Sequence, residues 1–551
     1  MSAHTITLTN NTGLGLTRTL EAQAAQYSPR DWAVLAITGV WIFQVVKVLA
    51  NKILGVKAPF VGHKSWIEPG WVVGLRFVRG AAPMIREGYA KFKSSMFKVR
   101  RNDADILIIP NKFVDELRNL PDEKISAIRA HIKNLLGRYS TTLILLESDL
   151  HSKVLQTKLT PSLGSIIPIV KDELDFALKK ETPDCKGKWV EVQINAILLK
   201  IVARISARVF LGEKRCRNEE WLATSIEYTE NVFRTVMTLR MFPAFLHPFI
   251  AVGLPSYWRV HSNLATAKRI ISPEVRERRR LESDSGGEEE YRKPQDLLQW
   301  MMDAANANDG QPDKLAHRQL LLSLASIHTT TMSAAHALYD LCARPDYFEP
   351  LRAEALRVLD EDGGWKKTTL NKMRNLDSFL KESQRHNPPS LLAFNRIVRS
   401  PITLSDGTTL PRGTHFSMAS DSVLHDPCNI ANPSAFDGFR YARMRNSESG
   451  AANKHQFAMT DANSLHFGHG KYSCPGRFFA ANEIKMILAH LLLNFDFAYP
   501  EGKGRPRNLS ADENVYPDPE ARLLMRRREG VVGGGGGGGE KSKAWEAVMM
   551  E

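Results

Sequence analysis

Residues 465–479 read Leu-His-Phe-Gly-His-Gly-Lys-Tyr-Ser-Cys-Pro-Gly-Arg-Phe-Phe, and this stretch decides the fold. It places one cysteine, Cys474, in a glycine-rich turn, with the aromatic Phe467 upstream of it. Glycines permit tight turns and a close approach of the backbone to a ligand. The glycines of this turn are Gly468, Gly470 and Gly476.

The segment after the turn, residues 480–497, is apolar with helical periodicity and predicts a helix. Free N–H groups and the positive end of the dipole at a helix start favour a thiolate at Cys474. No CxxC motif or Cys/His cluster surrounds this cysteine, which argues against zinc. The alternative is a buried structural cysteine in a loop, which is the commoner role of a lone Cys.

The spacing Phe467-x-x-Gly470-x-x-x-Cys474-x-Gly476 resembles the haem-thiolate loop of the cytochrome P450 family. The resemblance implies that Cys474 is the axial ligand of a haem b iron. It also implies that Phe467 packs beneath the flat cofactor. The other cofactor-binding residues it implies are Gly468, Gly470, Tyr472 and Gly476. Tyr472 stands where the family usually has Arg or His, so its hydroxyl would bind a propionate without a charge.

A second motif lies in the apolar, alanine-rich segment 315–341, which predicts a buried helix. It contains Ser326, His328 and Thr329, at positions where the family has a small residue, an acid and a proton-delivering threonine. The resemblance therefore makes Thr329 the oxygen-facing residue. His328 replaces the acid, and two hypotheses stay open for it: a proton relay, or a structural role beside Thr329.

A third motif, Glu382 with Arg385, shares one face of a helix predicted at 376–384. Taken alone it is an ordinary surface pair worth a few tenths of a kcal/mol. The resemblance implies instead a buried network that includes Arg440 and supports the cysteine loop. Arg396 matches the family's propionate-binding basic residue.

The family's Trp-x-x-x-Arg motif, which supplies another propionate ligand, is absent from this chain. Lys158 and His151 lie in the corresponding region, and the sequence does not choose between them.

The resemblance implies a mainly α fold with small β-sheets (α+β), in a single large haem domain at residues 53–526. Two short strands are expected at 97–100 and 105–110. Prolines divide residues 241–255, so this apolar stretch cannot be one helix. The charged run 276–293 reads as a solvated loop.

Residues 32–46 carry no charge, and apolar residues resume beyond Lys47. A bilayer span takes roughly 20 apolar residues, so 32–52 is marginal and is predicted to be a transmembrane anchor, with a buried helix as the alternative. Lysines after the segment place the haem domain in the cytosol. The expected location is the endoplasmic reticulum membrane, with residues 1–31 lumenal and 527–551 a Gly-rich flexible tail. Asn10 begins a glycosylation sequon.

The chain has 74 Lys and Arg against 60 Asp and Glu, a net charge of +14. No nucleic-acid motif is present, so this charge favours a membrane and an acidic protein partner rather than nucleic acid. The five cysteines are widely spaced and odd in number, which argues against a disulfide framework. No flavin or nicotinamide motif is visible, so the resemblance implies a separate NADPH–cytochrome P450 reductase.

The predicted function is a haem-thiolate monooxygenase that acts on a hydrophobic small molecule. The motifs look most like those of fungal enzymes of secondary metabolism, which favours a terpenoid; a polyketide or an alkaloid is the alternative substrate. A haem-thiolate isomerase or dehydratase that needs no reductase is the second hypothesis. A non-catalytic haem-binding scaffold protein is the third.

Overall fold

The computed structural model describes residues 28, 30–32, 34–35, 38–39, 55–65, 67–285, 291–447 and 453–529. Most of the predicted anchor and lumenal segment, and the tail from residue 530, lie outside these ranges. Within the described ranges, the structure contains no helix with the length and apolar character that a bilayer crossing requires.

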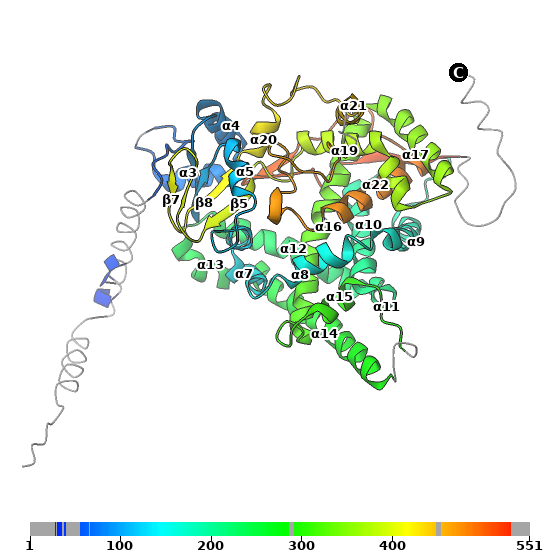
Figure 1. Cartoon of the computed structure of the whole chain (residues 1–551), viewed down its shortest axis with the longest axis horizontal. Coiled ribbons are helices and arrows are strands. Elements are labelled where there is room, and N and C mark those ends of the chain that lie inside the picture. The colour runs from blue at the N-terminus through cyan, green and yellow to red at the C-terminus, as the bar shows by residue number, and fades with distance from the viewer. Residues whose placement is uncertain are drawn as a thin grey trace, which may run out of the picture.

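The described chain is dominated by helices, with the strands β5, β7 and β8 at one end of the molecule (Figure 1). The helices of the first half are α3 (Gly70–Arg79), α4 (Ala82–Lys91), α5 (Val114–Leu117), α6 (Ala127–Asn134), α7 (Gly137–Ser140), α8 (Leu150–Val154), α9 (Leu163–Glu181), α10 (Ile194–Leu211), α11 (Glu213–Cys216), α12 (Glu219–Arg240), α13 (His247–Gly253) and α14 (Pro255–Asp284). Those of the second half are α15 (Leu297–Ala304), α16 (Pro312–Cys342), α17 (Phe348–Asp362), α18 (Lys367–Lys372), α19 (Arg374–His386), α20 (Ser420–Leu424), α21 (Arg440–Ser447) and α22 (Arg477–Asn494). The mainly α class with small sheets is thus confirmed.

The largest sheet has the order β1-β2-β8-β5-β3. Its strands are β1 (Phe97–Arg101), β2 (Ala104–Ile108), β3 (Ile125–Ser126), β5 (Ala393–Val398) and β8 (His415–Met418). Only β2 and β8 run parallel among its pairs. A second sheet joins β4 (Val190–Val192), β12 (Leu523–Arg527) and β9 (Phe495–Ala498), and the pairs β6 (Ile402–Thr403) with β7 (Thr409–Leu410) and β10 (Leu509–Ala511) with β11 (Asn514–Tyr516) complete the set.

Helix α16 is the axis of the helical part. Pro312 occupies its first turn, where a missing N–H costs nothing. Apolar side chains on several of its faces then bury it against α10, α12, α14, α19 and α22. Compared with the apolar segment 315–341, the helix begins three residues earlier and ends one residue later.

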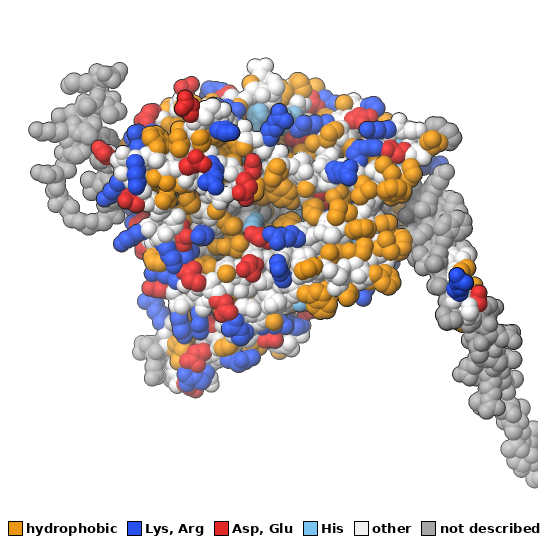
Figure 2. Space-filling view, turned by 180° about the vertical axis from the view of Figure 1, so that it is seen from behind, with side chains coloured by type: hydrophobic (Ala, Val, Ile, Leu, Met, Phe, Trp, Pro, Cys, Tyr) orange, Lys and Arg blue, Asp and Glu red, His pale blue; other side chains and the backbone are white. Residues whose placement is uncertain are grey.

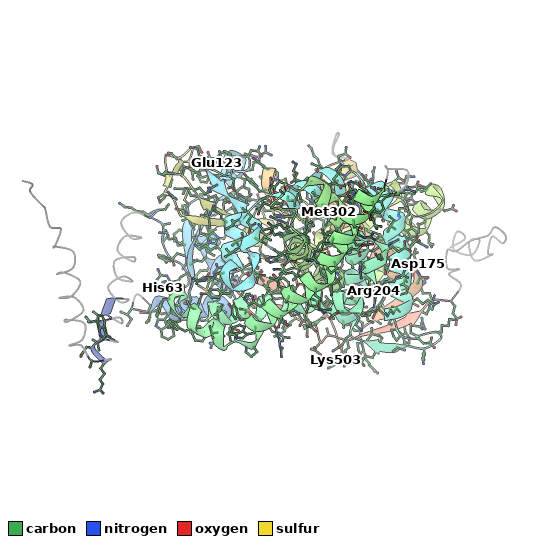
Figure 3. All side chains as sticks on the ribbon, turned by 90° about the horizontal axis from the view of Figure 1, so that it is seen from below. His63, Glu123, Asp175, Arg204, Met302 and Lys503 are labelled. Atoms are coloured by element: carbon green, nitrogen blue, oxygen red, sulfur yellow. The ribbon has the colours of Figure 1, made fainter. Side chains whose placement is uncertain are left out.

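The view from below separates the two ends of the molecule (Figure 3). His63 lies toward the end that carries the large sheet, while Asp175 and Arg204 lie toward the opposite, helical end. Met302 of α15 lies between them.

Two expectations about the helices are wrong in part. The helix predicted at 480–497 ends at Asn494, and Phe495 begins strand β9, which pairs with β12. The charged run at 276–293 is helical as far as Asp284. Two of its arginines are paired, because Arg278 is buried between Glu274 and Asp296 while Arg280 binds Glu277 on the surface.

The proline-rich stretch 241–255 is broken as expected. A short 3₁₀ turn at Ala244–Leu246 leads into α13, and α14 begins at Pro255. Each proline stands at or just before the start of a helical turn, where its fixed φ is tolerated.

Candidate active site

The cysteine loop is held against the turn that follows α5. Gly468 and Gly470 have φ values of 68° and 72°, the left-handed region that favours glycine. A Cβ added at Gly470 would lie 2.5 Å from the carbonyl oxygen of Arg118. The backbone N–H of Lys471 donates to that same oxygen at 3.2 Å. The loop is therefore docked so closely that only glycine fits at position 470.

Cys474 opens on an internal space. Its N–H donates to the carbonyl of Phe467 at 2.7 Å, which closes the loop. The side chain is accessible to water although protein surrounds it, and this burial raises the pKa of the thiol. The N–H groups of Gly476 and Arg477 and the Arg477 charge lower the pKa without overcoming the burial. The N–H groups at the helix start thus act in the expected direction, and a bound metal would deprotonate the thiol outright.

Gly476 shows where a flat cofactor fits. Its φ of −91° suits any residue, so backbone strain does not explain a glycine here. A Cβ added at this position would meet no heavy atom within 4 Å. Gly476 therefore leaves open space beside the sulfur of Cys474, and the residues of the loop fit a planar group bound through that sulfur.

Three polar side chains lie together where haem carboxylates need partners. Arg396 of β5 is 2% exposed, and its Nε and Nη2 have no hydrogen-bond acceptor among the described residues. Its guanidinium lies 5.4 Å from the ring centroid of Tyr472, whose buried hydroxyl also lacks a partner there. Burial and the charge of Arg396 lower the pKa of His131 to about 4. Buried donors without partners are rare in proteins, and those of Arg396 and Tyr472 suit propionates.

His131 is the member of this group that the sequence does not reveal. It lies on α6, which packs against β5, and nothing in its neighbouring residues marks it. The two residues considered for the missing Trp-x-x-x-Arg lie elsewhere. The Nδ1 of His151 is 3.4 Å from Nη1 of the buried Arg318, and Lys158 is exposed on a π-helical turn at Leu155–Leu159.

One face of α16 opens in the interior. Ala325 and Thr329, one turn apart, are exposed, while Ile327 and Thr330 beside them are buried. Thr329 Oγ1 donates to the carbonyl of Ala325 at 2.7 Å and lies 3.2 Å from that of Ser326. Since α16 packs against α22, which begins three residues after Cys474, the open face and the cysteine loop belong to neighbouring elements.

His328 points to a different neighbour. Its Nε2 lies 3.4 Å from the carbonyl of Ile226 on α12. Burial lowers its pKa, so the ring is neutral at neutral pH. The structure thus places Thr329 on the open face of α16 and His328 on the face that packs against α12.

Glu382 and Arg385 form a buried ion pair. They are 0% and 1% exposed, and two hydrogen bonds of 2.9 and 2.7 Å join them. Burial would raise the pKa of Glu382, but Arg385, His386 and the Asp437 N–H hold it at about 2. The ordinary surface pair considered from the sequence is therefore excluded for this part of α19.

The same carboxylate organises the segment that precedes α21. Arg440 Nε lies 3.4 Å from Glu382 Oε1, and Nη1 of Arg385 donates to the carbonyl of Pro433 at 2.6 Å. Arg440 also donates to the carbonyl of Ala431 at 2.6 Å. The ion network therefore fixes the irregular chain that leads toward the cysteine loop.

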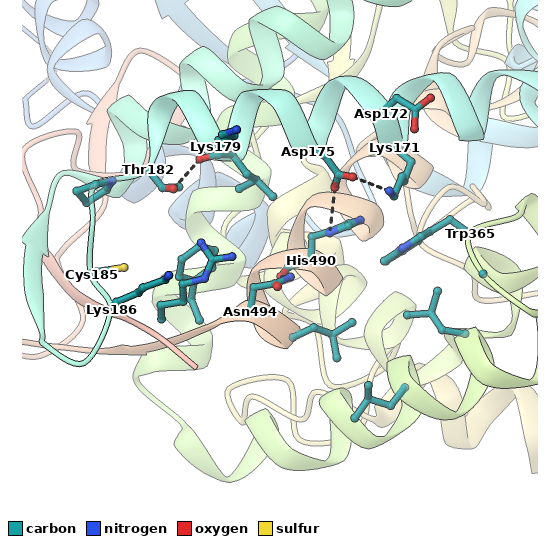
Figure 4. A pocket seen from close by; sticks show the side chains of 18 of the residues that line it. Lys171, Asp172, Asp175, Lys179, Thr182, Cys185, Lys186, Trp365, His490 and Asn494 are labelled. Atoms are coloured by element: carbon teal, nitrogen blue, oxygen red, sulfur yellow. Dashed lines mark hydrogen bonds and ion pairs between the residues drawn. The ribbon is translucent and has the colours of Figure 1, made fainter. Parts of the chain in front are cut away.

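A surface groove of about 940 Å³ lies apart from these residues, between α9, α17 and α22 (Figure 4). Lys171 and Asp175 pair along its wall at 2.5 Å, and the ring of His490 stacks on that of Trp365 at 4.3 Å. None of the site residues described above lines it. We therefore place the chemistry at Cys474 and not in this groove.

Residues 83–525 match the family model "Cytochrome P450". The chain belongs to the cytochrome P450 family. It is 67% identical over 501 residues, 90% of this chain and 93% of the relative, to cytochrome P450 monooxygenase AN1598 of Emericella nidulans. It is 48% identical over 90% of its length, and 93% of the relative's, to the ent-kaurene oxidase of Gibberella intermedia.

A solved cyanobacterial cytochrome P450, retinoic acid-bound CYP120A1, shares the fold. The TM-score is 0.62 at 19% identity, over 86% of this chain and 99% of that one. The protein is therefore a cytochrome P450 monooxygenase with a haem cofactor and a cysteine axial ligand, and Cys474 of the loop is the cysteine that would provide it.

Each site residue of this cytochrome P450 then has a definite task. When bound, the haem supplies activation of O2 by iron whose electron density the thiolate increases. Cys474 would provide that sulfur, and Arg396, Tyr472 and His131 would hold the carboxylates. Ala325 leaves room on α16, where the hydroxyl of Thr329 would bind water or dioxygen and orient a proton.

Proposed function

We propose that the enzyme inserts one oxygen atom from O2 into a terpenoid of fungal secondary metabolism. The observation that carries this is the open face of α16 at Ala325 and Thr329, flanked by apolar residues and adjacent to the Cys474 helix. A site built this way takes a hydrophobic ligand and presents it to the activated oxygen. The similarity to an enzyme named ent-kaurene oxidase supports a terpenoid rather than a polyketide or an alkaloid.

A separate NADPH–cytochrome P450 reductase is proposed as the electron donor. Lys471 is exposed beside the cysteine loop, and the guanidinium of Arg477 donates to the carbonyl of Cys474 at 2.9 Å. Positive charge close to the cysteine suits an acidic partner that delivers electrons near the iron.

Membrane attachment is part of the same proposal. Large apolar side chains are exposed around α13 and the start of α14, among them Phe249 at 78%. The full set is Met241, Phe242, Phe245, Phe249, Val252 and Trp258, and Trp71 of α3 is exposed as well. Asn102 connects the two regions, because it donates to the Met241 carbonyl and lies against Gly74 of α3. Figure 2 shows hydrophobic side chains gathered along the same side of the molecule.

Reconstitution tests the proposed reaction. The purified chain is combined with a fungal reductase, NADPH, ¹⁸O2 and ent-kaurene or a related terpenoid hydrocarbon. We expect a product that carries one ¹⁸O atom and forms only when both NADPH and reductase are present. Product without NADPH would favour the isomerase or dehydratase instead. Cys474→Ser should abolish both turnover and the red-shifted Soret band of the reduced, carbon-monoxide-bound protein, and a band that survives in this variant would refute the ligand assignment.

A further inference from the structure

Strand β5 contains a residue whose backbone conformation is unusual for a strand. Phe394 has a φ of 59°, in the left-handed region that favours glycine. Among the described residues, it is the only non-glycine residue with a positive φ that lies inside a strand. A bulky side chain is an outlier in this region, and such strained residues cluster at functional sites. Phe394 is therefore a candidate for a functional role.

The strain belongs to a β-bulge beside Arg396. β5 pairs with β8 at Ala393 and again at Arg396, but the register shifts between these two pairs, so β5 has one residue more than β8 there. In one type of bulge, the first residue of the bulged strand is left-handed and is normally glycine. Phe394 occupies that position, and the hydroxyl of Ser417 on β8 donates to the Ala393 carbonyl at 2.7 Å. A bulge re-aims the side chains that follow it, and here the next ladder residue is Arg396.

The ring of Phe394 supports the guanidinium of Arg396. The guanidinium carbon lies 4.1 Å from the ring centroid, which is a cation–π contact. The ring is held in turn, because Phe394 is 3% exposed and belongs to an apolar cluster with Phe113 and Phe416. Nη1 of Arg396 donates to the Asn395 carbonyl at 2.8 Å. These contacts fix the guanidinium, while its Nε and Nη2 have no acceptor among the described residues.

This arrangement prepares Arg396 for an anion. Burial lowers the pKa of Arg396 to about 10, and no acid among the described residues forms an ion pair with it. A buried charge without a partner is unfavourable, and a carboxylate that accepts from the two free N–H groups would remove that penalty. An arginine that is already held in one orientation loses little conformational freedom when the carboxylate binds.

We propose that Phe394 is a positioning residue for haem: the bulge at its left-handed backbone and the face of its ring together hold Arg396 in the orientation that receives a haem carboxylate. Glycine would suit the backbone at this position but would leave the guanidinium without a ring to lie on. The strained phenylalanine is thus explained by its neighbour. The proposal rests on the haem site of the monooxygenase proposed above and does not depend on the substrate.

The experiment uses the full-length haem enzyme and compares Phe394→Leu with Phe113→Leu. Leucine keeps an apolar side chain in the cluster but has no ring face, and Phe113 is the matched control because it is a buried phenylalanine of the same cluster. The readouts are the rate of haem transfer to excess apomyoglobin, the reduction potential of the iron and the melting temperature of the apoprotein. Both variants should lower the melting temperature alike. Only Phe394→Leu should lose haem several-fold faster and have a more negative potential, because a carboxylate that is less well neutralised favours ferric iron.

A double-mutant cycle tests whether Phe394 acts through Arg396. In an Arg396→Gln background the guanidinium is absent, so Phe394→Leu should no longer change the rate of haem loss or the potential. The same change with and without the arginine would overturn the proposal, and so would a Phe394→Leu enzyme whose haem loss and potential equal those of the parent. If Phe394→Leu does not fold, Phe394→Gly, which relieves the backbone, replaces it in the cycle. If Arg396→Gln does not retain haem, the dimethyl ester of haem replaces haem, and the difference between parent and Phe394→Leu should vanish.

Failure of the proposed substrate gives a different result. The haem-transfer rate, the potential and the melting temperature are measured without substrate, NADPH or reductase. If no terpenoid is oxidised, the contrast between Phe394→Leu and Phe113→Leu is still expected. The positioning of Arg396 and the substrate class are therefore tested separately.

Discussion

Gly470 and Gly476 are both glycines of the cysteine loop, yet the chain constrains them differently. Gly470→Ala places a Cβ 2.5 Å from the Arg118 carbonyl and in the left-handed region, a strain of about 1–2 kcal/mol before the clash is counted. Gly476→Ala strains nothing in the chain. We expect the first variant to melt several degrees lower and the second to keep its melting temperature but bind less haem. Haem-to-protein ratio and thermal unfolding measure both, and equal melting losses would contradict the assignment.

Thr329 and His328 are adjacent residues for which we expect different effects on coupling. Thr329→Ala removes a hydroxyl from the open face of α16, so substrate and haem binding should persist while NADPH consumption is diverted several-fold toward peroxide. His328→Ala removes a contact with α12 and should slow turnover with little diversion. The ratio of product to NADPH consumed distinguishes them. Full coupling in Thr329→Ala with strong diversion in His328→Ala would mean that the two roles are reversed.

Residues that belong to a linear motif could be found from the sequence, and residues brought in by the fold could not. Cys474 and Thr329 stand in recognisable spacings. His131 carries no such sign, because what marks it is the charge of Arg396 beside it, which the packing of α6 against β5 brings about.

At the scale of the element, α19 depends on one ion pair. Glu382→Ala leaves Arg385 charged and buried, a loss of about 3–5 kcal/mol. We expect protein that fails to retain haem, because the network fixes the chain leading to the cysteine loop. Glu277→Ala removes an exposed partner of Arg280 at the same i, i+3 spacing and should cost under about 1 kcal/mol. Normal haem content in Glu382→Ala would show that the loop does not rely on the pair.

The Glu382–Arg385 pair also makes the free energy of unfolding depend on pH. The folded pKa of Glu382 is about 2, below its ordinary value of 4.5. A depressed pKa contributes stability above about pH 4.5, and this contribution is lost as the pH falls toward 2. This contribution to the free energy of unfolding is about 3 kcal/mol. Urea unfolding from pH 6 to pH 3 should therefore be steeper in pH for the parent than for Glu382→Gln, and parallel curves would refute the shift.

The sequence does not predict the ends of helices and strands where distant partners in the fold determine them. The apolar run 480–497 looks uniform, but pairing with β12 turns its last residues into strand β9. The charged run at 276–284 looks solvated, yet buried partners of Arg278 keep it helical. In both cases long-range contacts override local preference, whereas α16 and α19, which are periodic and well buried, were placed nearly correctly.

The whole molecule is expected to meet the membrane twice, through residues 32–52 and through the exposed apolar side chains around α13. Removing residues 1–52 should leave weak, salt-resistant vesicle binding, because a phenylalanine contributes about 1.5–3 kcal/mol when its side chain leaves water. Phe249→Asp in the truncated chain should reduce vesicle binding at least about tenfold. Leu356→Asp, at an exposed position of α17, is the matched control and should change nothing. Flotation with phospholipid vesicles measures binding.

In the full chain, protease added to intact microsomes should digest the haem domain, and protection of that domain would reverse the predicted topology.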